Sequence, residues 1–155
     1  MAPSLKEKIG KDLLESLKAH DEVRLGTLRL LSAAIQNREI EKRGKTGESV
    51  LTEEEVLEVL TREAKKRKEA ALLYKEGGRS DLESKELVEL KIIEEYLPSQ
   101  LGEEEVKSIV LTALETVKPK SEKDFGRVMG EVMRHAKGRV DSAVVSRLIK
   151  EHFPK

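Results

Sequence analysis

The stretch EAKKRKEAALLYKEGGRSDL, residues 63–82, decides how the rest of the chain is interpreted. It begins within a run whose apolar residues recur at helical spacing, and it then meets Gly77 and Gly78, which favour the positive φ that ends a helix. The following Arg-Ser-Asp segment predicts the start of another helix. The stretch therefore predicts two consecutive helices separated by a glycine turn. The apolar seam of the first helix comprises Val56, Leu60, Ala64, Ala71 and Tyr74.

The basic run KKRK at residues 65–68 does not form one patch. Helical residues lie about 100° apart, so the four side chains spread around the helix, and three of them are predicted to be solvated. Arg67 instead falls in the middle of the apolar seam. An arginine at that position forms an ion pair with the next helix, where Glu86 or Glu89 could accept it, extends its charged end to the edge of the seam, or lines a groove and contacts a ligand.

The glycine turn offers a second interpretation of the same region. Arg79 follows Gly78 and precedes Asp81, an arrangement that turn and capping chemistry can explain. An exposed arginine near a helix N-terminus can equally bind an anionic group or a protein partner. The candidate residues for such a groove are Arg67, Tyr74, Arg79, Asp81 and Glu86.

The remainder of the chain also has the pattern of helices, and no alternating run bounded by turns indicates a strand. The second helix is predicted to end near Gly44. The predicted start points are capping boxes at Ser4 with Glu7, Thr52 with Glu55 and Ser80 with Glu83, and N-caps at Asp21 and Asp141.

The segment PSQLG, residues 98–102, is the candidate linker, because proline ends the preceding helix and an acidic helix start follows. We therefore expect an all-α fold. A four-helix N-terminal domain over residues 1–97 precedes a three-helix C-terminal domain over residues 103–155.

Composition restricts the classes of function. The 155 residues include no cysteine, which excludes thiolate catalysis and cysteine metal sites, and no apolar run approaches a membrane span of about 20 residues. We expect a cytoplasmic protein with no membrane contact. Net charge is zero overall, but residues 118–155 hold 10 Lys and Arg against 5 Asp and Glu, a net of +5. This polarity fits phosphate contacts, and helix capping also explains it.

Three segments together resemble the YqeY family. They are LRLLSAAIQNREIEKRG (residues 28–44), residues 63–101 from EAKKRKEAALLYKEGGRSDL to EEYLPSQL, and DFGRVMGEVMRHAKGRVDSAVVSRLIKE (residues 124–151). The family is similar to the C-terminal tail region of the B subunit of glutamyl/aspartyl-tRNA amidotransferase. The resemblance spans almost the whole chain and implies an all-helical, two-part protein. It also implies a tRNA-binding or amidotransferase-associated role, since the equivalent tail helps to hold the tRNA body.

A carbon-nitrogen ligase activity with glutamine as amido donor is implied only by the resemblance. The sequence itself lacks the Ser-Ser-Lys arrangement of an amidase and any Gly-rich phosphate loop. Gly126 and Gly130 lie four residues apart within an amphipathic helix, a spacing that favours close helix packing over a phosphate-binding role. The three histidines lack metal-ligand spacing. We therefore predict no catalytic residues, no metal and no cofactor.

RNA binding is the leading expectation, with tRNA or a tRNA-handling complex as partner. Because the chain holds only two Tyr, two Phe and no Trp, contacts to the phosphate backbone are favoured over base stacking. Lys137, Arg139 and the helix that Asp141 caps could form a phosphate site, although two helix caps beside solvated cations explain the same residues. The alternative is a protein-interaction or small-anion-binding module with no RNA role. The candidate RNA-binding residues are Lys120, Lys123, Arg127, Arg134, Lys137, Arg139, Arg147 and Lys150.

Overall fold

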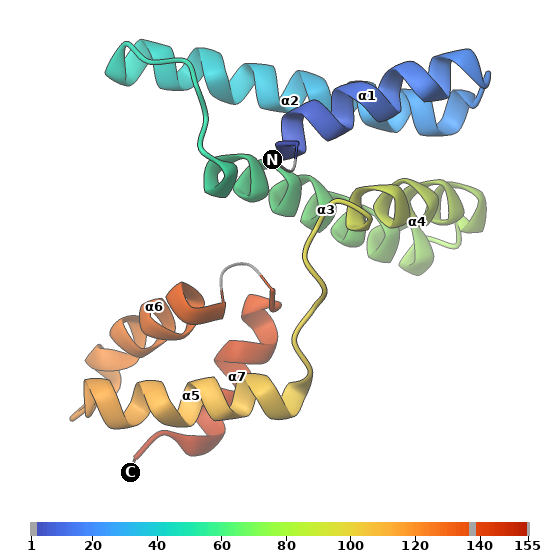
Figure 1. Ribbon diagram of the computed structural model, residues 1–155. Coiled ribbons are helices and arrows are strands. Elements are labelled where there is room, and N and C mark those ends of the chain that lie inside the picture. The colour runs from blue at the N-terminus through green and yellow to red at the C-terminus, as the bar shows by residue number, and fades with distance from the viewer. Residues whose placement is uncertain (1–2, 137–138, 155) are drawn as a thin grey trace. The chain divides into compact units, whose positions relative to one another are not determined.

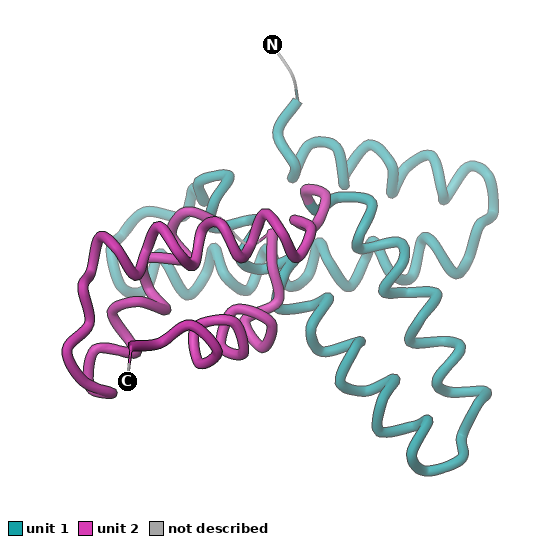
Figure 2. Tube along the Cα trace, turned by 90° about the horizontal axis from the view of Figure 1, so that it is seen from below, with its two compact units in different colours: residues 1–97 teal, residues 98–155 magenta. Residues whose placement is uncertain are grey.

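The computed structural model describes residues 3–136 and 139–154, and these residues form helices and connecting segments with no strand among them (Figure 1). The all-α prediction is therefore confirmed. The chain divides into two compact units, unit 1 from Met1 to Leu97 and unit 2 from Pro98 to Lys155 (Figure 2). That these units are separate domains with four and three helices stays a prediction.

Unit 1 is built from two pairs of helices. Short turns join the members of each pair, so α1 packs along α2 and α3 packs along α4 (Figure 1). The buried core between them is aliphatic apart from Tyr96, as the low aromatic content requires. The helices are α1 (Leu5–Lys18), α2 (Glu22–Thr46), α3 (Glu53–Glu76) and α4 (Ser80–Glu94). The core residues are Ile9, Leu28, Leu31, Ile35, Val56, Val59, Leu60, Ala64, Leu90, Ile93 and Tyr96.

Most of the predicted helix starts in unit 1 are present. Asp21 accepts a hydrogen bond from the Arg24 N–H, and Thr52 with Glu55 forms a complete capping box. Ser4 makes half of its box, since its Oγ accepts from the Glu7 N–H. These polar contacts satisfy backbone donors that the first turn of a helix leaves without partners.

One boundary prediction was wrong. The Ser80 box does not form, because Ser80 is already helical and Arg79 occupies the N-cap without a side-chain capping bond. The Arg79 N–H instead donates 2.8 Å back to the Tyr74 carbonyl, while Gly78 takes the left-handed conformation at φ 72°. Because this hydrogen bond ends α3, α4 begins at Ser80, one residue earlier than predicted. The end of α2, predicted near Gly44, lies at Thr46, and Gly47 is its left-handed C-cap at φ 80°.

A polar cluster fixes the start of α3 against α2. The Glu55 carboxylate accepts from the Lys42 Nζ at 2.7 Å, from the Thr52 N–H at 3.1 Å and from an Arg38 nitrogen at 3.3 Å. Lys42 also donates to the Val50 carbonyl at 2.8 Å. The hydrogen bond from Lys42, with that from the Thr52 backbone, lowers the pKa of Glu55 to about 2. The loop before α3 is thus held by charge as well as by its cap.

Unit 2 packs three helices and one 3₁₀ turn around a second aliphatic core. Its aromatic contribution is one tilted pair, Phe125 and Phe153, whose ring centroids are 6.2 Å apart. Asp141 caps the last helix as predicted, accepting from the Ala143 N–H. The elements are α5 (Glu103–Val117), η1 (Glu122–Asp124), α6 (Phe125–Ala136) and α7 (Ser142–His152). The core residues are Val106, Val110, Ala113, Val128, Val132, Val145, Leu148 and Ile149.

Candidate functional site

Arg67 lies between α3 and α4 and forms an ion pair with each. Its Nη1 is 2.7 Å from the Glu63 carboxylate one turn earlier, and its Nε is 3.5 Å from the Glu89 carboxylate on α4. The Arg67 side chain is only 11% exposed and that of Glu89 15%. The Nε itself is buried without a hydrogen bond of acceptable geometry. Of the two glutamates on α4 that could accept Arg67, the structure pairs it with Glu89.

The other candidate groove residues make different contacts from those of Arg67. Arg79 and Asp81 pair with each other in the open, at 3.3 Å, and the arginine bond lowers the pKa of Asp81. Tyr74 is half-buried and is joined to Arg79 through the backbone. Glu86 lies half-buried on α4. Because Arg67 is occupied by two carboxylates, these five residues do not present one shared set of free polar groups, and partner binding through them stays a prediction.

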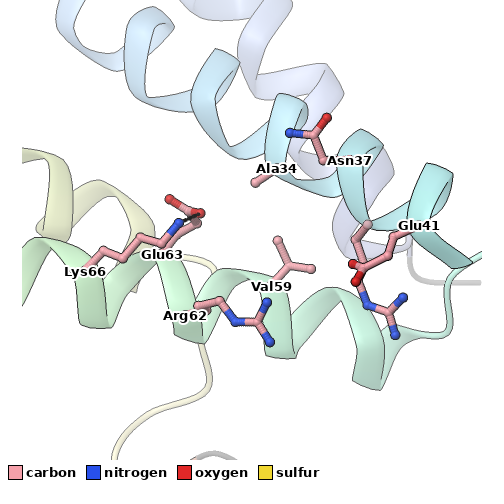
Figure 3. A pocket seen from close by; sticks show the side chains of 8 residues that line it. Ala34, Asn37, Glu41, Val59, Arg62, Glu63 and Lys66 are labelled. Carbon is pink, nitrogen blue, oxygen red and sulfur yellow. Dashed lines mark hydrogen bonds and ion pairs between the residues drawn. The ribbon is translucent and has the colours of Figure 1, made fainter.

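A shallow groove of about 180 Å³ lies between α2 and α3 (Figure 3). The sequence did not predict it. Ala34 of α2 and Val59 of α3 face each other across it, and polar side chains surround them. The spacing within either helix gives no sign of this groove, because it exists only where the two helices pack together. Its polar lining is Asn37, Arg38, Glu41, Arg62, Glu63 and Lys66.

In unit 2, four of the predicted RNA-binding cations lie close together in sequence, on η1, on α6 and just before them. Lys120 and Lys123 are exposed, and neither pairs with a carboxylate among the described residues. Arg127 and Arg134 are seven residues apart on α6, which places them about 20° apart around the helix and about 10 Å apart along it. Each is 69% exposed, and each pairs with one nearby carboxylate, of Asp124 and Glu131 respectively. We call Lys120, Lys123, Arg127 and Arg134 the α6 cationic face.

The two glycines of α6 border this face. A Cβ built on Gly126 or on Gly130 would meet nothing within 4 Å, and both residues are exposed. The predicted close packing of a helix against them is therefore wrong. The packed face of α6 instead carries Val128 and Val132, on the opposite side of the helix. The glycines leave bare backbone beside the two arginines.

Two of the remaining predicted cations, Arg139 and Arg147, are already engaged. Arg147 bonds the carboxylates of Glu103 and Glu151, and Lys150 is exposed on α7. Arg139 donates from its Nε to the Ser99 carbonyl at 3.0 Å, so that part of its guanidinium is already occupied. Lys137 lies outside the described residues. The predicted phosphate site at Lys137, Arg139 and the α7 start thus has one member engaged elsewhere, and the Asp141 carboxylate already occupies the end of α7.

Neither a membrane span nor a metal centre is found where the structure describes the chain. None of the described helices is both long and apolar enough to cross a bilayer. Across residues 3–136 and 139–154, no three His, Asp or Glu side chains gather closely enough to hold a metal ion.

Comparison with known proteins identifies the family. Residues 6–153 match the family model of Yqey-like proteins. The chain is 29% identical over 148 residues to altered inheritance of mitochondria protein 41, mitochondrial, of Pyrenophora tritici-repentis, an alignment that covers 93% of this chain and 78% of that protein. It is 33% identical over 96 residues to the uncharacterized protein C22F3.15 of Schizosaccharomyces pombe, covering 62% of this chain and 74% of that protein. Since the family model spans nearly the whole chain, this protein belongs to the Yqey-like family.

Proposed function

We propose that this protein is a non-catalytic helical module that binds the phosphate backbone of a structured RNA, with tRNA as the expected ligand, through the α6 cationic face. The observation that carries the proposal is that two exposed arginines, Arg127 and Arg134, share one side of α6 beside bare helix backbone, with two exposed lysines just before them in sequence. Contacts of this kind recognise RNA by backbone and shape, and they do not require aromatic side chains on which bases could stack.

The ion pairs on this face do not oppose the proposal. The Arg127–Asp124 pair at 3.4 Å and the Arg134–Glu131 pair at 2.6 Å are solvent-exposed on the arginine side. Exposed pairs contribute about 0–1 kcal/mol, so a phosphate group can replace one carboxylate contact at small cost.

A double charge reversal tests the proposal. Lys123→Glu with Arg127→Glu should abolish measurable binding of deacylated tRNA at physiological salt. At low salt it should reduce the slope of log affinity against log salt by about two, or about one per phosphate contact. Binding is measured by fluorescence anisotropy across a salt series, with duplex RNA of equal length as competitor.

The matched control reverses two exposed lysines of α3, with Lys65→Glu and Lys68→Glu, which gives the same change in net charge far from α6 in sequence. This control should retain tRNA preference. Equal losses in both double variants, or equal binding of tRNA and duplex RNA by the parent, would reduce the interaction to general charge attraction and reject the proposal.

Gly130→Ala separates the stability of α6 from its proposed role. Alanine in a helix interior is more stable than glycine by about 0.5–1 kcal/mol, and the added Cβ meets open space here. We therefore expect a higher free energy of unfolding, measured by calorimetry, together with weaker tRNA binding, because the methyl group separates the phosphate backbone from the helix. A rise in stability with unchanged tRNA affinity would show that Gly130 is not part of the binding surface.

The alternative is a protein-interaction module with no RNA role. It is favoured by Leu72, Leu73, Leu87 and Val88, large apolar side chains that are exposed on α3 and α4 in the part of unit 1 that carries Arg79. If tRNA binding fails in every variant including the parent, this surface becomes the site to test. We do not extend the proposal to the ligase activity, whose only support is resemblance.

The compartment belongs to the same proposal. tRNA is present in the cytoplasm, which the sequence predicts for this chain, and in mitochondria, which the printed name of the Pyrenophora relative gives for that protein. The proposed role is compatible with both.

A further inference from the structure

The groove between α2 and α3 lies wholly within unit 1, and its lining carries more cations than carboxylates. Ala34 and Val59 form its apolar part, one from each helix (Figure 3). The charged lining residues are three cations, Arg38, Arg62 and Lys66, and two carboxylates, Glu41 and Glu63. Three positive charges less two negative ones leave the groove with a formal charge of +1.

Both carboxylates of the groove are paired with cations that do not line it. The Glu63 carboxylate lies 2.7 Å from Arg67, in addition to its contact with Lys66 at 3.1 Å. The Glu41 carboxylate lies 3.6 Å from Lys45. Because cations outside the lining share these two negative charges, the groove is more positive than the count of its own residues indicates.

Arg62 and Asn37 supply hydrogen-bond donors that no protein group uses in the described part of the chain. Neither side chain forms an ion pair or a hydrogen bond there, and both are exposed. Helical side chains point toward the helix N-terminus, so the Arg62 side chain runs along α3 toward the turn that carries Val59 (Figure 3). A guanidinium has five N–H donors and a side-chain amide has two, which leaves the groove rich in donors.

Arg38, on the α2 side of the groove, is only partly neutralised. Its carboxylate partner is Glu55 at 3.3 Å, and the same carboxylate accepts from Lys42 at 2.7 Å. One negative charge therefore serves two cations. A second guanidinium in the same small groove adds like-charge repulsion, and an anion bound in the groove would offset it.

The size and chemistry of the groove restrict the anion. Its volume of about 180 Å³ is below the roughly 300–1,000 Å³ of sites for drug-sized ligands, so the ligand is small. Guanidinium groups bind phosphate through paired hydrogen bonds, and a dianion suits a groove with more than one cation. We propose that the groove binds a small phosphate monoester, whose phosphate contacts Arg62 and Asn37 and whose organic chain lies against Ala34 and Val59. This inference does not depend on RNA binding, because it uses no residue of the α6 cationic face.

Asn37 provides the readout, because it is the one asparagine of the chain. Isotopic labelling of asparagine alone therefore gives a single side-chain amide signal in the magnetic resonance spectrum of the full chain, and this signal comes from the groove. Propyl phosphate is the probe, above about pH 7, where its phosphate is largely dianionic. It should shift the Asn37 amide signal saturably, with a dissociation constant of about 1 mM or lower.

Two comparison ligands separate charge from apolar contact. Propyl sulfate has a similar shape but one negative charge, and inorganic phosphate lacks the apolar chain. Each should bind at least about threefold more weakly than propyl phosphate. Equal affinity for propyl sulfate would overturn the proposal, and equal affinity for inorganic phosphate would reject an ester and assign the groove to free phosphate.

Arg62→Gln should weaken propyl phosphate binding at least about tenfold, because it removes the charged donor. The substitution spares the fold, since the Arg62 side chain forms no ion pair or hydrogen bond among the described residues. The matched control is Lys65→Gln, which removes the same charge from an exposed residue of α3 outside the groove and should change the affinity by less than about twofold. No saturable shift of the Asn37 signal in the parent, or equal losses in the two variants, would also overturn the proposal.

Discussion

Arg67→Ala is expected to lower the free energy of unfolding of unit 1 by about 3 kcal/mol, the lower end of the cost of breaking a buried ion pair. The reason is the carboxylate that remains. Glu63 keeps Lys66 at 3.1 Å, whereas Glu89 has no second ion-pair partner among the described residues. A charge that is 85% buried would then lie between α3 and α4 without compensation. Differential scanning calorimetry of the full chain measures the loss.

A paired substitution separates charge from packing. Arg67→Met with Glu89→Leu removes both charges and keeps apolar volume in the interface, so it should recover stability to within about 1 kcal/mol of the parent or exceed it. If Arg67→Ala alone costs less than about 1 kcal/mol, the pair behaves as a surface pair, and the burial of its two side chains is energetically unimportant.

Tyr96→Ala should have an effect of similar size, about 3–5 kcal/mol, because it removes a large buried side chain from the unit 1 core. Tyr96→Phe should cost about 1–2 kcal/mol, because it removes only the hydroxyl that Asp12 and Arg24 contact. Burial, with the bond to Asp12, raises the pKa of the Tyr96 hydroxyl, so it stays a neutral donor throughout the usual pH range. Urea titration followed by circular dichroism gives both values.

The matched control for Tyr96 is the other tyrosine. Tyr74 is half-buried on α3, and Tyr74→Phe should change stability by no more than about 0.5 kcal/mol. Similar losses from Tyr96→Phe and Tyr74→Phe would contradict the role assigned to the Asp12 and Arg24 bonds.

The parts of the structure that follow from local chemistry were predictable from the sequence. The α3 seam and the stop at Gly77–Gly78 depend on neighbours within a few residues, as do the caps at Asp21, Thr52 and Asp141. The absence of the predicted Ser80 capping box also has a local cause. The α3 closure through Arg79 and Tyr74 competes with the predicted box for the same backbone, and it forms instead.

The parts that depend on residues distant in sequence were not predictable. The partner of Arg67 could be narrowed to Glu86 or Glu89, but only the packing of α3 on α4 selects Glu89. The hydrogen bond from Arg139 to Ser99 joins residues 40 positions apart, and no periodicity in the sequence indicates it. The exposure of Gly126 and Gly130 depends on which face of α6 meets α5 and α7, and the GxxxG spacing is the same on either face.

The aromatic residues are divided between the units in a way that has a practical consequence. Tyr74 and Tyr96, the two tyrosines of the chain, belong to unit 1, whereas Phe125 and Phe153, its two phenylalanines, belong to unit 2, and there is no tryptophan. Tyrosine fluorescence and the tyrosine band of the near-ultraviolet spectrum therefore arise from unit 1 alone. Far-ultraviolet circular dichroism reports helices of both units. The native chain thus carries a label-free optical probe that distinguishes the melting of one unit from that of the other.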